Sequence, residues 1–318
     1  MSESGFSHIT VLKDELVKGL ALKPGALAVD CTAGGGGHTR LMLEQVGPSG
    51  HIYAIDRDQL AITTLTQRFE HELQRGEISL LKGSFSEVIS DIPDQVDAIA
   101  ADLGVSSPQL DLAERGFSFM KDGPLDMRMN PEQGPSAADI IRDYEQHELT
   151  TLFRKWGEEP KAKFIAQAIV KQRDITPITT TLQLAEIVKG AVHYKTKSHK
   201  HPATKVFQAL RIAVNEELTE VESLLSKALT KLKPGGRLAI ITFHSLEDRI
   251  VKQFFKQCSG SANQIPELRG LPLTEEQLSQ YYKAEGKIIK PFPVNPTDEE
   301  IDRNPRARSA RLRVLEKC

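Results

Sequence analysis

The chain has 318 residues, with 41 lysines and arginines against 43 aspartates and glutamates and a formal net charge of -2. With 39% hydrophobic residues it can bury a sizeable core, and at about 150 residues per domain it is long enough for two domains, which excludes a disordered or collagen-like chain. Its longest apolar runs fall far short of the roughly 20 residues that span a bilayer. The first residues lack the pattern of a secretory signal, so we expect a cytoplasmic protein.

Strand-like and helix-like segments alternate over the first hundred residues. Short apolar segments typical of buried strands occur at 27–30, 51–56, 78–82 and 96–103. Helical sequence follows the first two of them, at 38–46 and 59–73. This alternation predicts βαβ units in a parallel sheet, and therefore an α/β fold.

The alternation stops after residue 103. The segment 116–135 is rich in glycine, proline and methionine, as an ordered functional loop is, and helices are then expected at 137–143, 146–155, 161–172 and 181–191. The last of these has Thr180 and Gln183 at the spacing of a capping box. We therefore expect residues 106–204 to form an inserted all-α domain that recognises the substrate, within a core made of 1–105 and 205–318.

The α/β pattern resumes in the last third of the chain. One long amphipathic helix is expected over 204–232, ended by Lys233-Pro-Gly-Gly236, and a strand follows at 237–243. Ser245 and Asp248 have the spacing of a capping box for a helix at 246–257. Further elements are expected as a short helix at 274–281 and an antiparallel hairpin of 287–290 with 310–315.

Four consecutive glycines, Gly34 to Gly37, connect the first strand to the first helix. A tight turn explains one or two of them, whereas a run of four also allows a ligand to approach the amides of a helix N-terminus. Asp56 ends the next strand, where a carboxylate can accept hydrogen bonds from ribose hydroxyls. The glycine turn and Asp56 together favour a cofactor that contains a nucleoside.

The spacing of the turn indicates which cofactor. A dinucleotide fingerprint needs a glycine where this chain has Thr39. Asp30-x-Thr32-x-Gly34-x-Gly36 instead resembles the turn by which class I methyltransferases bind S-adenosylmethionine. After the fourth strand, Ser107-Pro108 resembles part of the Pro-Pro-aromatic motif of amino-methyltransferases, although Gln109 replaces the second proline. Two aromatic residues could supply the stacking surface or equally belong to the core, namely Phe117 and Phe119.

Seven longer blocks resemble the ribosomal RNA small subunit methyltransferase H family. They are Asp102–Asp111 (DLGVSSPQLD), Arg115–Met120 (RGFSFM), Gly123–Met129 (GPLDMRM), His201–Thr204 (HPAT), Phe207–Ile212 (FQALRI), Phe243–Arg249 (FHSLEDR) and Asn304–Ser309 (NPRARS). The resemblance implies a class I, Rossmann-like fold with a mostly parallel seven-stranded sheet. It also implies S-adenosylmethionine-dependent N4-methylation of a decoding-centre cytidine in 16S rRNA, within the small ribosomal subunit.

The resemblance also implies the residues that bind the cofactor. The amides of Gly36, Gly37 and His38 would hold its methionine carboxylate, and Asp56 its ribose. Phe85 would cover the adenine face, and Asp102 and Gln109 would contact polar edges of the cofactor.

Methyl transfer to an exocyclic amine is an in-line displacement, so alignment should supply most of the catalysis. Ser107 and Pro108 are expected to position the amine. His244 is a candidate proton acceptor or base-edge contact, and a histidine that caps the following helix is the alternative. We expect a structural ion network rather than metal ligands at Glu247, Asp248 and Arg249, and no required metal.

Two basic strips without any carboxylate, 187–215 and 303–315, are candidates for contact with RNA phosphates. The target cytidine has to leave its stack, which predicts a flipped base. Two other functions remain open, a DNA amino-methyltransferase and a non-catalytic ribosome-assembly factor. The sequence does not decide between a monomer and a homodimer.

Overall fold

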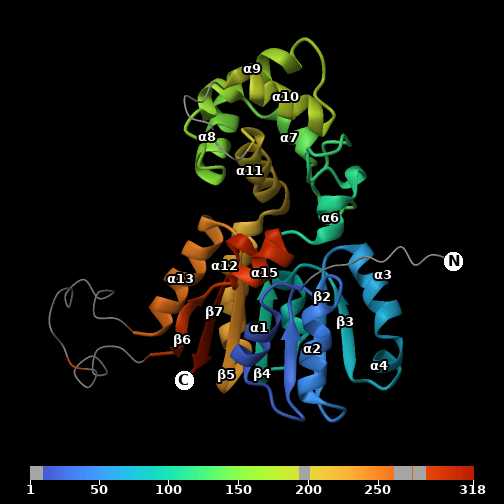
Figure 1. Ribbon diagram of the computed structural model, residues 1–318, viewed down its shortest axis with the longest axis vertical. Helices are drawn as coiled ribbons and strands as arrows, with labels where there is room; N and C mark the ends of the chain where they lie inside the picture. Colours follow the sequence, from blue (N-terminus) through green and yellow to red (C-terminus); the bar gives the residue numbers. More distant parts are fainter. Residues whose placement is uncertain (1–9, 193–200, 261–273, 275–283) are drawn as a thin grey trace. The chain divides into compact units, whose positions relative to one another are not determined.

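A computed structural model describes residues 10–192, 201–260, 274 and 284–318 (Figure 1). The chain forms two compact units, one made of residues 1–104 and 218–318 and the other of residues 105–217. The lysines of the first basic strip at 195, 197 and 200, and nearly all of the short helix expected at 274–281, lie outside the described residues. No helix in the described part of the chain is long and apolar enough to cross a membrane.

The first unit contains a seven-stranded sheet in the order β3-β2-β1-β4-β5-β7-β6. The strands are β1 (Leu27–Asp30), β2 (His51–Asp56), β3 (Ile78–Lys82), β4 (Val96–Asp102), β5 (Leu232–Thr242), β6 (Gly286–Val294) and β7 (Arg311–Lys317). β1 to β5 pair in parallel, whereas β7 is antiparallel to both β5 and β6. The expected fold class, a mostly parallel seven-stranded sheet, is confirmed, and so is the closing hairpin.

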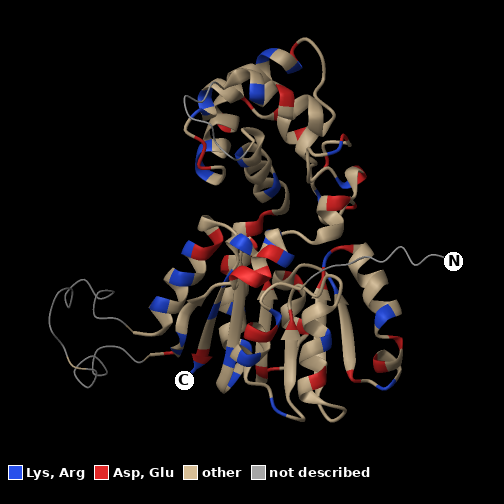
Figure 2. Cartoon of the chain, in the orientation of Figure 1, with Lys and Arg blue, Asp and Glu red and all other residues tan. Residues whose placement is uncertain are grey.

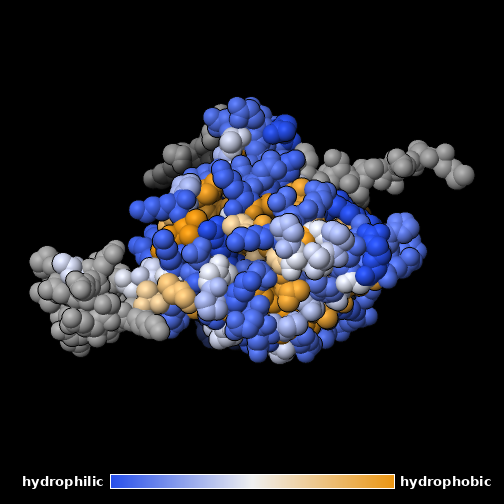
Figure 3. Space-filling model, turned by 90° about the horizontal axis from the view of Figure 1, so that it is seen from below, coloured by the Kyte–Doolittle hydropathy of each residue, from blue (hydrophilic) through white to orange (hydrophobic). Residues whose placement is uncertain are grey.

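Helices cover both faces of this sheet (Figure 1). Successive strand residues face opposite sides, so Ala28 belongs to one apolar core and Val29 to the other. The core around Ala28 is closed by α1 (Lys13–Leu20), α2 (Gly37–Val46) and α3 (Gln59–Arg68), and the other by α12 (Glu217–Lys231) and α13 (Ser245–Cys258). Short helices complete the unit, namely α4 (Glu70–Gln74), α5 (Phe85–Val88) and α15 (Asp298–Arg303). The face at the amino ends of the parallel strands is mostly hydrophilic (Figure 3).

Three parallel strands each end in an aspartate, which are Asp30 in β1, Asp56 in β2 and Asp102 in β4. Because β2, β1 and β4 are adjacent and parallel, their carboxyl ends lie at one edge of the sheet. Ligands of open α/β sheets bind at this edge, so the topology brings these carboxylates to the expected position of a site.

The second unit is helical and has its own core. Its helices are α6 (Ser107–Asp111), α7 (Ala137–Asp143), α8 (Gln146–Trp156), α9 (Ala162–Arg173), α10 (Thr181–Ala191) and α11 (Ala203–Asn215). Their apolar sides pack around Phe153, Ile165 and Leu210. The capping box of Thr180 and Gln183 is present as expected. The unit extends to Glu217, beyond the limit at 204 expected from the sequence.

The long helix expected over 204–232 is two helices, α11 and α12, and that expectation is wrong. Glu216 between them has φ 50, in the left-handed region, which breaks the run of helical dihedrals. The preceding residue, Asn215, is buried, and its side chain accepts from the Met129 N–H at 2.8 Å and donates to the Met127 carbonyl at 2.8 Å. The apolar period continues through the break, which is why the sequence alone gave no sign of it.

Candidate cofactor site

The glycine turn is shaped first by the protein's own packing. Gly34 and Gly36 have φ of 51° and 78°, a region that L-residues rarely adopt. A Cβ on Gly36 would lie 2.5 Å from Cε2 of Phe69, and one on Gly37 would overlap the Thr10 hydroxyl. The need for glycine at these positions therefore arises from close neighbours as well as from turn geometry.

The turn ends in a helix N-terminus without a side-chain cap. Gly36 is the N-cap of α2, and it has no side chain to accept a hydrogen bond from the first-turn amides. Helix N-termini attract anions because unsatisfied N–H groups and the helix dipole point the same way. The first turn of α2 is thus suited to hold a carboxylate, as expected for Gly36, Gly37 and His38.

Asp56 fastens the turn to the end of β2. One carboxylate oxygen accepts from the Gly34 N–H at 2.8 Å, and the other accepts from the Asp58 N–H at 2.8 Å. Burial raises the pKa of Asp56 to about 6, although these two N–H groups act in the opposite direction. Each oxygen retains a lone pair, so the carboxylate can still accept a hydrogen bond from a ligand hydroxyl.

Behind the turn, His38 is buried between two oxygen atoms. Its Nε2 lies 2.9 Å from the Val11 carbonyl oxygen, and its Nδ1 lies 3.7 Å from Oδ2 of Asp102. The other oxygen of that carboxyl group, Oδ1, is buried and has no hydrogen-bond partner among the described residues. Burial is the main cause that raises the pKa of Asp102 to about 7, and the nearby carboxylates of Asp30 and Glu247 add to it, whereas His38 opposes them.

Two threonines lie beside the strand-end aspartates. The Thr39 hydroxyl donates to Asp30 at 2.6 Å, and the Thr32 hydroxyl accepts from the Asp102 N–H at 2.6 Å. Burial raises the pKa of Asp30, and His38 and the hydrogen bonds from Thr39 and from the Thr32 N–H counteract it. The sequence placed Thr32 in the turn motif but gave neither threonine a hydrogen-bonding role.

Phe85 begins α5, directly after β3, behind a capping box of Ser84 and Glu87. Its ring is partly buried against the apolar core on the α12 side of the sheet. The structure therefore places this residue in the same unit as the glycine turn, after the strand next to β2.

Ser107, Pro108 and Gln109 form the first turn of α6, in the helical unit. Ser106 is the N-cap, and its N–H donates to the Gln109 side-chain oxygen at 2.9 Å. Gln109 is 4% exposed, so much of its amide serves the cap. The serine and the proline are half-buried.

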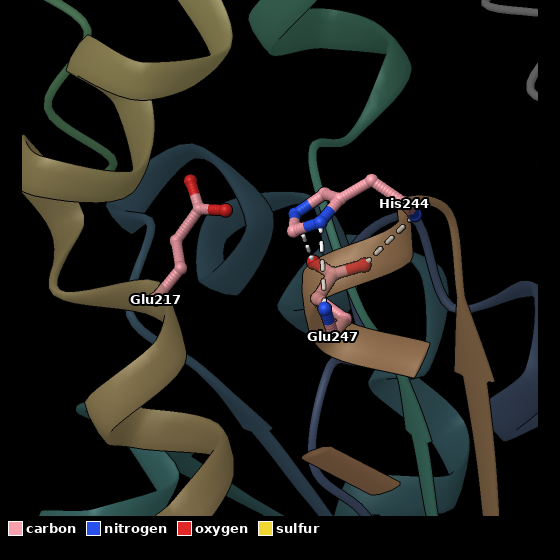
Figure 4. Close-up of side chains that lie close together, drawn as sticks. All are labelled: Glu217, His244 and Glu247. Carbon is pink, nitrogen blue, oxygen red and sulfur yellow. Dashed lines mark hydrogen bonds and ion pairs between the residues drawn. The ribbon is translucent and has the colours of Figure 1, made fainter. Parts of the chain in front are cut away.

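His244 is the N-cap of α13, one residue earlier than the capping box expected from Ser245 (Figure 4). Its Nδ1 accepts from the Glu247 N–H at 3.4 Å, and its Nε2 lies 3.0 Å from a Glu247 carboxylate oxygen. The structure therefore shows the capping geometry that was the alternative to a proton acceptor. Glu217, also labelled in Figure 4, makes two hydrogen bonds of 2.8 Å with Arg211.

Asp248, one of three residues expected in a structural ion network, pairs with two arginines of β7 that were not part of that expectation. It makes two hydrogen bonds with Arg313, at 2.8 and 3.0 Å, and a third with Arg311 at 3.0 Å. Arg313 is 3% exposed and its guanidinium lies 4.2 Å from the centre of the Phe292 ring. The two basic strips are therefore not uniformly available to phosphates, because Arg313 and Arg211 are already paired within the protein.

Of the two candidate stacking aromatics, Phe117 is buried in the core of the helical unit. Phe119 is partly buried and packs against Phe207 and His201, with ring centres 4.8 Å apart in both cases. Both rings thus belong to the packing of this unit, as the core alternative proposed.

Comparison with known proteins gives one family and several structures. The family model described as the MraW methylase family matches residues 5–318, which include both units. A candidate rRNA-methylase from Clostridium thermocellum is 13% identical, with a TM-score of 0.46 over 98% of this chain and 99% of that chain. A candidate methyltransferase from Streptococcus mutans in complex with SAH is 12% identical, with a TM-score of 0.45 over 98% and 99%. An rRNA methylase from Streptococcus thermophilus is 13% identical, with a TM-score of 0.41 over 96% and 93%.

Proposed function

The chain belongs to the MraW methylase family, and on this premise we propose that it transfers a methyl group from S-adenosylmethionine to the N4 amine of a cytidine in 16S rRNA. The proposed target is the decoding-centre cytosine at position 1402 of the standard bacterial numbering. The observation that carries the proposal is the set of three strand-end aspartates beside an uncapped helix N-terminus.

The residues at this sheet edge fit a cofactor that carries a carboxylate, an ammonium and ribose hydroxyls. The first turn of α2 is suited to the carboxylate and Asp56 to the hydroxyls. Oδ1 of Asp102 is a buried acceptor without a partner in the described part of the chain, and an ammonium group would satisfy it. Further contacts with the adenine and polar edges are proposed for Phe85 and Gln109. When bound, the sulfonium group supplies the reactive methyl.

Alignment is the main catalytic task of the protein in this proposal. Ser107 and Pro108 would hold the cytosine amine so that its lone pair points at the methyl carbon. The amine becomes strongly acidic only as the new N–C bond forms, so its proton can leave after transfer and no activated protein nucleophile is needed. The buried thiol of Cys31, whose pKa is raised well above its ordinary value by burial, is consistent with a packing role.

The proposal is tested by mass spectrometry of 16S rRNA from cells that lack this protein. One N4-methyl group on one cytidine should be missing. A plasmid with the wild-type chain or with the surface control Asp14→Ala should restore it, whereas Asp56→Ala should not.

The two other functions predict different results. A DNA amino-methyltransferase would leave the rRNA unchanged and label duplex DNA when the purified protein is given radioactive S-adenosylmethionine. A non-catalytic assembly factor would restore the rRNA methyl group with Asp56→Ala as well as with the wild-type chain. Either result would overturn the proposed function.

A further inference from the structure

Helix α9 has an outer face with an unusual combination of residues. Its inner face, Ala162, Ile165, Ala166 and Ile169, is fully buried in the core of the helical unit. Its solvent-exposed positions carry Lys163, Phe164, Gln167 and Lys171, and the whole helix contains no carboxylate. Phe164 is 56% exposed, so a large apolar ring faces solvent.

The exposed cations of α9 and of the end of α8 have no ion-pair partner among the described residues. Lys163 and Lys171 make no ion pair or side-chain hydrogen bond with the residues that the structure describes. Arg154 is likewise exposed and unpaired within the described chain, in the last turn of the adjacent helix α8. We call Arg154, Lys155, Lys161, Lys163 and Lys171 the α8–α9 basic band.

Some lysines elsewhere in the molecule have structural partners. Lys205 donates to the Glu158 carbonyl at 2.7 Å, and Lys231 donates to the Ile92 carbonyl at 2.7 Å. These cations hold backbone carbonyls, which is a structural role. One exposed carboxylate, Glu158, lies between α8 and α9 in sequence, and it has a partner of its own. The basic band therefore carries net positive charge that the described residues do not neutralise.

Aromatic rings lie among these cations. The Lys161 ammonium lies 5.8 Å from the centre of the Phe164 ring, and the Lys155 ammonium lies 5.5 Å from that of Trp156. Along α9, residues 161, 164, 167 and 171 follow one another at helical spacing, so cation, ring, amide and cation form one stripe of roughly 15 Å. Single-stranded nucleic acids are bound by such surfaces, where lysines neutralise phosphates and rings stack on unpaired bases.

We propose that the α8–α9 basic band and Phe164 bind a single-stranded segment of the RNA substrate, with one unpaired base stacked on the Phe164 ring. This inference rests on the proposed function for the identity of the RNA. A duplex would meet the lysines but would offer no free base face to the ring, whereas an acidic protein would use the charges without needing an aromatic ring.

Binding of fluorescently labelled RNA to the full-length protein tests the inference. Phe164→Ala should weaken binding of a single-stranded oligonucleotide by about tenfold, the loss expected for one stacked base. The double variant Lys163→Ala/Lys171→Ala should reduce the slope of log affinity against log salt by about 0.7 per lysine. Leu60→Ala, which removes another exposed apolar side chain, and Lys13→Ala/Lys18→Ala, which removes two other exposed lysines, should bind as the wild type does.

A spectroscopic measurement separates stacking from a loss of folding. In a Trp156→Phe background, Phe164→Trp should retain tight binding, and single-stranded RNA should quench the new indole, whereas duplex RNA should not. Unchanged affinity of Phe164→Ala, equal losses for duplex and single strand, or a changed oligomeric state in sedimentation would overturn the inference.

Cofactor binding by the same variants distinguishes this inference from the proposed function. If wild type and variants bind S-adenosylmethionine and methylate RNA equally well, the docking surface is refuted and the function stands. If the wild type itself transfers no methyl group to RNA, the function is refuted independently of α9.

Discussion

Asp102 ends β4 with one carboxyl oxygen that is buried and has no hydrogen-bond partner among the described residues. Its pKa of about 7 has burial as the largest cause, and Asp30, His38 and Glu247 are the charged or titratable groups around it. The pKa of this carboxyl group is higher in the folded protein than its ordinary value of 3.8. Its stabilising contribution to the free energy of unfolding is therefore fully present below pH 3.8 and is lost as the pH rises through about 7. Below about pH 7 the Asp102 carboxyl group is therefore mostly neutral, unless a cation binds beside it.

This charge state predicts the pH dependence of cofactor binding. In the proposed site the cofactor's ammonium pairs with the ionised carboxylate of Asp102, so affinity should fall by about tenfold per pH unit below pH 7. Calorimetric titrations between pH 5.5 and 8.5 measure this, and binding near pH 7 should release a proton to the buffer. Asp102→Asn should bind weakly without the step at pH 7, whereas Asp56→Asn should keep it. A flat profile for the wild type would contradict this role of Asp102.

His244 can be tested by a substitution that keeps its observed hydrogen bond. Asparagine is a good N-cap, so His244→Asn should preserve the start of α13, whereas His244→Ala should lower the free energy of unfolding by about 1 kcal/mol. If the imidazole only caps the helix, His244→Asn should keep wild-type kcat. A loss of kcat in His244→Asn with unchanged stability and KM would assign it a chemical role instead.

At the scale of elements, the junction between β1 and α2 combines backbone strain with close packing. Gly36 and Gly47 flank the same helix, and both have positive φ, 78° and 63°. Among the described residues, Phe69 and Leu65 would contact a new Cβ on Gly36, whereas nothing lies within 4 Å of one on Gly47. The two backbones also differ, because Gly36 is in the left-handed helical region with ψ 22° and Gly47 has ψ -174°.

We expect Gly47→Ala to lower the free energy of unfolding by about 1–3 kcal/mol, because its φ of 63° with ψ of -174° lies in a region that is essentially limited to glycine. Gly36→Ala should lower it by about 1 kcal/mol for the left-handed backbone and by a further 1–3 kcal/mol or so for overpacking, and should also weaken cofactor binding. Urea denaturation of both variants measures these losses. A loss of only about 1 kcal/mol in Gly36→Ala would show that Phe69 and Leu65 move aside without cost.

At the scale of the whole molecule, ion pairs within the protein decide which charged side chains are free to contact RNA. The five arginines of 303–315 look equivalent in the sequence, but Arg313 is buried against Asp248, whereas Arg303 and Arg308 are exposed. Figure 2 shows that lysines and arginines are interspersed with acidic residues over both units. The near-zero net charge therefore reflects nearly equal numbers of acidic and basic residues, of which some are paired within the described part of the chain.

Charge reversal at the buried Arg313 and at the exposed Arg308 should affect different properties, stability in the first case and RNA binding in the second. Arg313→Glu should lower the free energy of unfolding by about 3–5 kcal/mol, because it leaves Asp248 buried beside a second negative charge. Arg308→Glu should unfold as the wild type does and should reduce RNA affinity and its salt dependence. Thermal unfolding and RNA titration of both variants check this. Normal stability of Arg313→Glu would show that the buried pair is dispensable.

The sequence by itself determined the elements and the chemistry that recur locally. Alternating strands and helices, the glycine turn, and aspartates at strand ends follow from periodicity and dihedral preference, which act over a few residues. The first and last residues of β1, β2 and β3 were predicted correctly, and membership of the family followed from its long signature blocks.

Only the tertiary structure decided how distant residues are paired and which are exposed. It broke one apparent helix at Glu216, made His244 a cap, buried Arg313 against Asp248 and left Phe164 in water. Pairing and exposure depend on residues far apart in the chain, and an amphipathic period contains no information about them. Hydrogen bonds and burial between distant segments are set when each unit packs its own core, and these contacts determine which charges remain free.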